Sequence, residues 1–218
     1  MKEPKLVRLN MAIARGNCNR QLKESKMSAT NAPFGLRPAF HPSGLDRAQA
    51  LAGGIPSGYA SNILKGQPVE YLANNGVIQP VSATEAWSGA FAGCEWTDTT
   101  GRRRVSNYWP ASTTYIAGSC IAYFYNDPNI VYEVQADGSM AQTSVGNEAN
   151  FTNLTAGSTT TGLSQSTLGS ATLVGSGNGG QMRIVDLGQQ VNNAWGDAYT
   201  IVRVVNSKTQ FFGAFNAI

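Results

Sequence analysis

The sequence is poor in charged residues, histidine and cysteine. Asp, Glu, Lys and Arg make up 13% of its 218 residues, well below the roughly 25% of an average soluble domain. It has one histidine, His41, and three cysteines. A surface with so little charge is typical of a protein that works within an assembly.

The three cysteines, Cys18, Cys94 and Cys120, do not have the spacing of a metal site or a disulfide framework. They lack the C-x₂-C pairs of zinc ligands, and their odd number disfavours a set of structural disulfides. We therefore expect reduced thiols, with Cys94 and Cys120 inside apolar strand patterns. No metal and no cofactor is predicted.

The sequence also lacks the motifs of common active sites. His41 has no nucleophile elbow to accompany it, and a Ser-His-Asp arrangement would need it folded against a buried acid and an activated serine. We interpret His41 as structural or solvent-facing. The acidic residues could supply a glycosidase pair only if two of them converged, so we interpret them as turn caps and rim charges. The sequence predicts no catalytic residue and a protein that is not an enzyme.

Long apolar runs are absent as well. No stretch of 18 apolar residues occurs, and the N-terminal segment lacks the apolar core of a secretory signal. Neither a transmembrane helix nor export through a signal peptide is expected.

Charge is unevenly distributed along the chain. Residues 1–26 hold seven Lys or Arg and two Asp or Glu, which leaves nine basic and eleven acidic residues, a net charge of −2, in residues 27–218. We treat 1–27 as a basic N-terminal extension, either a disordered arm or a misassigned start, because Met27 opens a second plausible start. The body is not basic, so direct nucleic-acid binding is not expected.

Residues 28–57 are rich in proline and glycine and show little periodicity, which disfavours a long helix. We predict an extended arm here. Two alternatives stay open: the arm lies on a neighbouring subunit, or it packs on its own domain.

Residues 58–218 alternate short apolar runs with turn signals, which is the pattern of a β-barrel or a β-sandwich. We predict a single all-β domain with long Gly/Ser/Thr-rich loops over 152–180. The expected strands are Tyr59–Leu64, Pro68–Leu72, Val77–Val81, Trp87–Trp96, Arg104–Trp109, Thr113–Tyr125, Ile130–Gln135, Met182–Leu187, Ala198–Val205 and Phe211–Phe215. A single helical turn is predicted at Gln189–Ala194.

The most distinctive local feature is the turn Asp98–Arg104, which holds three consecutive arginines and leads to Tyr108 and Trp109. Three interpretations stay open. The arginines pair with Glu95 or Asp98 while the aromatic residues fill the core. Alternatively, the arginines contact an acidic partner protein with the aromatic residues as anchors, or they bind nucleic acid.

Several phrases together resemble a group of tailed-bacteriophage virion structural proteins associated with head decoration, or cement. The phrases are Asn31–Pro38, His41–Gly44, Thr100–Pro110, Asp127–Pro128 with Val131–Gln135, and Asn193–Asp197. The resemblance covers residues 28–218 and leaves out 1–26.

The resemblance implies a protein made in the bacterial cytoplasm and located in the virion. It would bind the major capsid protein on the outside of the head, as a homotrimer over the junctions between capsomers, and stabilise the shell. We select a candidate partner interface from the arm and the arginine turn: Phe34, Leu36, Arg37, Arg102, Arg103, Arg104, Tyr108 and Trp109.

Other functions remain as alternatives. A carbohydrate-recognising domain would use exposed Trp87, Trp96, Trp109 or Trp195 as stacking platforms. A glycan hydrolase would need two converging carboxylates. A third alternative is a tail or connector position in the virion.

Overall fold

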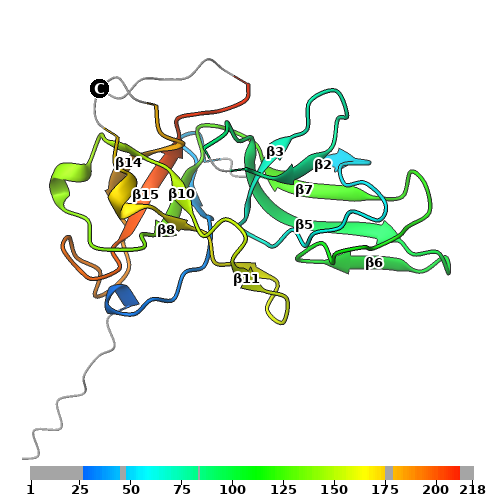
Figure 1. Ribbon diagram of the computed structural model, residues 1–218, viewed down its shortest axis with the longest axis horizontal. Coiled ribbons are helices and arrows are strands. Elements are labelled where there is room, and N and C mark those ends of the chain that lie inside the picture. Colours follow the sequence, from blue (N-terminus) through cyan, green and yellow to red (C-terminus); the bar gives the residue numbers. More distant parts are fainter. Residues whose placement is uncertain (1–26, 45–47, 83, 175–178, 212–218) are drawn as a thin grey trace, which may run out of the picture.

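The computed structural model describes residues 27–44, 48–82, 84–174 and 179–211, and in these ranges it is all-β (Figure 1). The longer strands are β1 (Arg37–Phe40), β2 (Gln49–Ala52), β3 (Pro68–Tyr71), β4 (Ile78–Pro80), β5 (Gly89–Thr97), β6 (Arg103–Ser106), β7 (Ile121–Tyr125), β8 (Val131–Gln135), β14 (Met182–Leu187) and β15 (Ile201–Asn206). Two-residue strands are β9 (Glu148–Ala149), β10 (Phe151–Thr152), β11 (Gly157–Ser158), β12 (Leu163–Ser164) and β13 (Thr167–Leu168). The helical elements described are three short 3₁₀ turns, η1 (Met27–Ala29), η2 (Gln142–Ser144) and η3 (Ser170–Thr172).

Two antiparallel sheets form the framework. The first has the order β1-β8-β15-β14-β9, and the second has the order β2-β7-β5-β3-β4, with β6 paired to β5. Both sheets end in edge strands, so the described chain forms the two open sheets of a sandwich-type fold and not a closed barrel. In the view of Figure 1 the two sheets lie beside each other.

Each sheet has its own hydrophobic core. In the first core, the Trp87 ring lies 5.1 Å from that of Phe151 and 5.8 Å from that of Tyr132. In the second, the Trp109 ring lies 5.3 Å from that of Trp96. Because Trp87 precedes β5 of the second sheet but packs in the first core, the segment before β5 joins the two halves.

The segment 28–57 is an integral part of both sheets. β1 pairs with β8 in the first sheet, and β2 pairs with β7 in the second. Ile55 is completely buried. In the structure, the segment packs on its own domain, which is the second of the two alternatives given for the arm. The segment is therefore not a separable arm, and we expect its deletion to unfold the protein.

Most of the predicted strands of the body are confirmed, and the errors lie in segments whose local pattern did not match the observed pairing. Residues 59–64 form only one isolated bridge, Ile63 to Trp109, and residues 113–120 form a loop before β7. The helical turn predicted at Gln189–Ala194 is absent. β1 and β2 were not predicted, because the prolines and glycines of residues 28–57 interrupt the apolar pattern of a strand. The strand predicted at Phe211–Phe215 lies, apart from Phe211, outside the described residues.

Within the described ranges no helix is long and apolar enough to cross a membrane.

Candidate interaction surface

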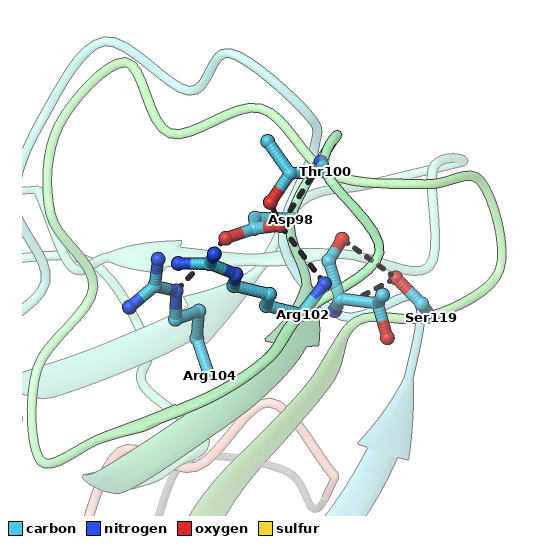
Figure 2. Close-up of polar contacts among 6 residues, drawn as sticks. Asp98, Thr100, Arg102, Arg104 and Ser119 are labelled. Carbon is cyan, nitrogen blue, oxygen red and sulfur yellow. Dashed lines mark hydrogen bonds and ion pairs between the residues drawn. The ribbon is translucent and has the colours of Figure 1, made fainter.

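The arginine turn joins β5 to β6 at one end of the second sheet, and Asp98 organises it (Figure 2). Oδ1 of Asp98 accepts hydrogen bonds from the Thr100 hydroxyl (2.6 Å) and from the backbone N–H groups of Thr100 and Arg102 (3.0 Å each). Oδ2 accepts one from Nε of Arg104 (2.9 Å). Gly101 adopts φ of +82°, a left-handed conformation that glycine accepts without strain. One carboxylate thus closes the turn.

The other side of β5 is anchored through Ser119. The Thr97 backbone N–H donates to the Ser119 hydroxyl (3.1 Å), and the Ile116 N–H donates to the Thr97 carbonyl (2.9 Å). Figure 2 shows Ser119 next to the base of the turn. The backbone groups of Thr97 therefore face the loop before β7, so those of Trp96 and Asp98 face β6.

These hydrogen bonds hold the pKa of Asp98 well below its ordinary value of 3.8, with the Thr100 hydroxyl as the largest contribution and the Arg102 N–H next. Because the folded state depresses this pKa, the carboxylate stabilises the fold fully above about pH 4, and the stabilisation is lost as the pH falls through the depressed value.

We expect Asp98→Asn to lower stability at pH 7 and to flatten the decline of stability below pH 4. Thr100→Val, which removes the hydroxyl alone, should act in the same direction with a smaller effect. Urea unfolding midpoints between pH 2.5 and 7 measure both. If the unfolding midpoint of Asp98→Asn fell below pH 4 as steeply as that of wild type, this role would be contradicted.

The arginines lie on opposite faces of β6. Arg103 forms an ion pair with Glu95, on the face that also carries Val105. Arg104 lies opposite Trp96 and pairs with Asp98, so Arg102 and Arg104 share the other face. Arg102 is exposed and forms no ion pair with a described residue.

The aromatic residues after the turn are not exposed anchors. Trp109 is 0% exposed, and its ring packs against those of Trp96 and Tyr115. Tyr108 is half-buried, and its carbonyl accepts a hydrogen bond from Sγ of Cys94 (3.5 Å). The first interpretation of the turn, with arginines paired to Glu95 and Asp98 and an aromatic residue in the core, is confirmed for Arg103, Arg104 and Trp109.

The candidate residues before β2 lie elsewhere, on the first sheet. Leu36 is buried in the first core, whereas Arg37 is exposed and bonds Oε2 of Glu133 (2.5 Å). The Arg37 guanidinium also covers the half-buried Phe34 ring at 4.9 Å. These three residues line a cavity of about 320 Å³ that includes no residue of the arginine turn. The structure therefore divides the predicted interface into two separate groups.

His41 has neighbours that the sequence did not reveal. Its Nδ1 lies 2.6 Å from the Ser43 hydroxyl, and its Nε2 lies 3.0 Å from Oδ2 of Asp127. However, Nε2 makes no aligned hydrogen bond among the described residues, and the Asp127 side chain is 44% exposed. The acid therefore does not fix the ring as a serine hydrolase requires, and this geometry favours a structural histidine. No local motif could reveal the cluster, because Asp127 is distant in sequence.

Several carboxylates serve the fold. Glu95, Asp98, Glu133 and Glu148 pair with arginines. Burial raises the pKa of Glu70, which accepts a hydrogen bond from the Gln79 amide (2.8 Å). Among the described residues, no group of three or more His, Cys, Asp or Glu could hold a metal ion. Cys94 and Cys120 are buried free thiols, and burial raises the pKa of Cys94 to about 12.

The tryptophans offer little for carbohydrate stacking. Trp87 and Trp109 are fully buried and Trp96 is 8% exposed. Trp195 is partly buried against the first core. The alternative of a carbohydrate-binding domain thus loses three of its four expected platforms.

The fold and the turn define an all-β protein with two open sheets and an exposed, arginine-rich edge strand at one end. Comparison of the chain with family models, with curated proteins and with solved structures found no match.

Proposed function

We propose that this protein is a decoration, or cement, protein that binds the outer surface of a phage head through the major capsid protein and stabilises the shell. The resemblance of residues 28–218 to head-decoration proteins is its first support. The observation that carries it furthest is that one of the phrases, Thr100–Pro110, coincides with the exposed turn and β6, where Val105 is 73% exposed.

The mechanism requires no chemistry beyond binding. A ligand that binds only the assembled shell shifts the assembly equilibrium towards it by mass action. If the protein is a homotrimer, three copies of a modest contact surface act together and raise the avidity, provided that all three can engage.

The direct test is cryo-electron microscopy of virions that contain the protein, with mass spectrometry to count its copies. The proposal expects hundreds of copies on the head surface. A few copies confined to the tail would overturn it and favour the tail or connector alternative.

Stabilisation gives an independent prediction. Heads saturated at one hundred times the dissociation constant should gain about 2.7 kcal/mol per site over heads that lack the protein. Heat- or denaturant-induced release of DNA from the two kinds of head measures this gain. Equal release curves at full occupancy would contradict the cement role.

A further inference from the structure

The outer edge of β6 has backbone groups that no described residue uses. Asp98 N–H donates to the Arg102 carbonyl (2.9 Å), which places Arg102 and Arg104 in the pairs that face β5. The alternation of an antiparallel ladder then turns the N–H and C=O groups of Arg103 and Val105 outwards. No hydrogen bond from the described chain reaches them.

The side chains on the two faces of β6 differ in charge. On one face, Arg104 is paired with Asp98, whereas the Arg102 side chain forms no ion pair with a described residue, which leaves a net positive charge. On the other, Arg103 is neutralised by Glu95, and Val105 projects into solvent. Figure 2 shows the Arg102 and Arg104 side chains extending from the turn towards the same side.

These charges disfavour a second copy of β6 as the occupant. A two-fold antiparallel pairing that used all the outward groups would join Arg103 to Val105 of the other copy and place Arg104 opposite Arg104. Like charges directly opposite each other destabilise a strand pair. An acidic strand has the complementary charge.

We propose that β6 pairs with an extended segment of the capsid protein, which adds a strand to the second sheet. This segment has a carboxylate on the side of Arg102 and an apolar side chain over Val105. Strand addition draws affinity from backbone hydrogen bonds and specificity from alternate side chains. The inference rests on the proposed function, because it identifies the partner chemistry at that surface.

Val105→Pro tests the strand pairing. Proline removes the outward N–H of residue 105. It breaks no hydrogen bond between β5 and β6, so the edge position tolerates it. Val105→Thr is the matched control, since it keeps the N–H and the branched shape. In sedimentation with purified heads that lack the protein, Val105→Pro should bind about tenfold more weakly or worse, and Val105→Thr should bind nearly as wild type. Thermal unfolding checks that both variants are folded.

Charge and backbone protection give two further readouts. Arg102→Glu should weaken head binding about tenfold at low salt, with the difference shrinking as salt rises. The amides of Arg103 and Val105 should exchange rapidly in the free protein and become protected on heads.

The outcomes separate the two proposals. If wild type does not bind heads, the proposed function fails and this inference fails with it. If wild type binds and Val105→Pro binds equally, or the two amides stay unprotected, strand addition alone is overturned. If Val105→Pro instead dissociates an oligomer of the free protein, β6 pairs with a second copy and the acidic partner is overturned.

Discussion

Replacing Trp109 by alanine is expected to lower the free energy of unfolding by about 3–5 kcal/mol, the usual cost of removing a buried aromatic side chain. The indole is completely buried, and it packs edge-on against the rings of Trp96 and Tyr115 in the second core. Urea unfolding measures the loss. A loss below about 1 kcal/mol would show that Trp109 does not support this core.

Phenylalanine substitutions at the two fully buried tryptophans provide a matched comparison. Nε1 of Trp87 donates to the Gln181 carbonyl (2.9 Å), whereas Nε1 of Trp109 has no hydrogen-bond partner among the described residues. Trp87→Phe removes one of the two hydrogen bonds to the Gln181 carbonyl, which still accepts the Ser207 N–H (3.1 Å), and Trp109→Phe removes a donor that had no partner. Since one variant loses a hydrogen bond and the other loses none, we expect Trp87→Phe to cost about 1 kcal/mol more than Trp109→Phe. Equal costs would contradict this difference.

Gly89→Ala is expected to be the most damaging single-methyl change, at about 3 kcal/mol. A Cβ at Gly89 would lie 1.8 Å from the carbonyl oxygen of Tyr125 and 2.6 Å from its carbonyl carbon. Both are backbone atoms of β7, so no side chain can rotate away, and the two strands would have to separate.

Gly76→Ala is the control for this effect. Gly76 has φ of +65°, but a Cβ added there would have no neighbouring atom within 4 Å. Alanine at this position should cost only about 1 kcal/mol of left-handed strain. Thermal unfolding of both variants tests the comparison, and a Gly89→Ala protein as stable as Gly76→Ala would show that the strands can part without cost.

The strands of the body could be predicted because their signals are local. Runs of branched and aromatic residues between turn residues predicted β3, β5 and β8, and residues 182–187 were placed with the observed bounds of β14. Burial of Cys94 and Cys120 followed from the same apolar pattern.

The errors arose where a long-range partner decided the conformation. Arg37–Phe40 contains a proline, yet it forms a strand because β8 supplies its hydrogen bonds. Residues 59–64 have strand composition but find only an isolated bridge to Trp109. The sequence of the arginine turn and β6 could not show that Trp109 is buried while Val105 is exposed.

By itself, the sequence determined the all-β class, most strands of the body and the turn that Asp98 closes, because each depends on residues near one another in the chain. Only the tertiary structure decided that there are two open sheets with separate cores, that the segment 28–57 belongs to both, and which arginines are neutralised. Strand pairing and burial depend on contacts between distant segments, and the local pattern does not encode which segments meet.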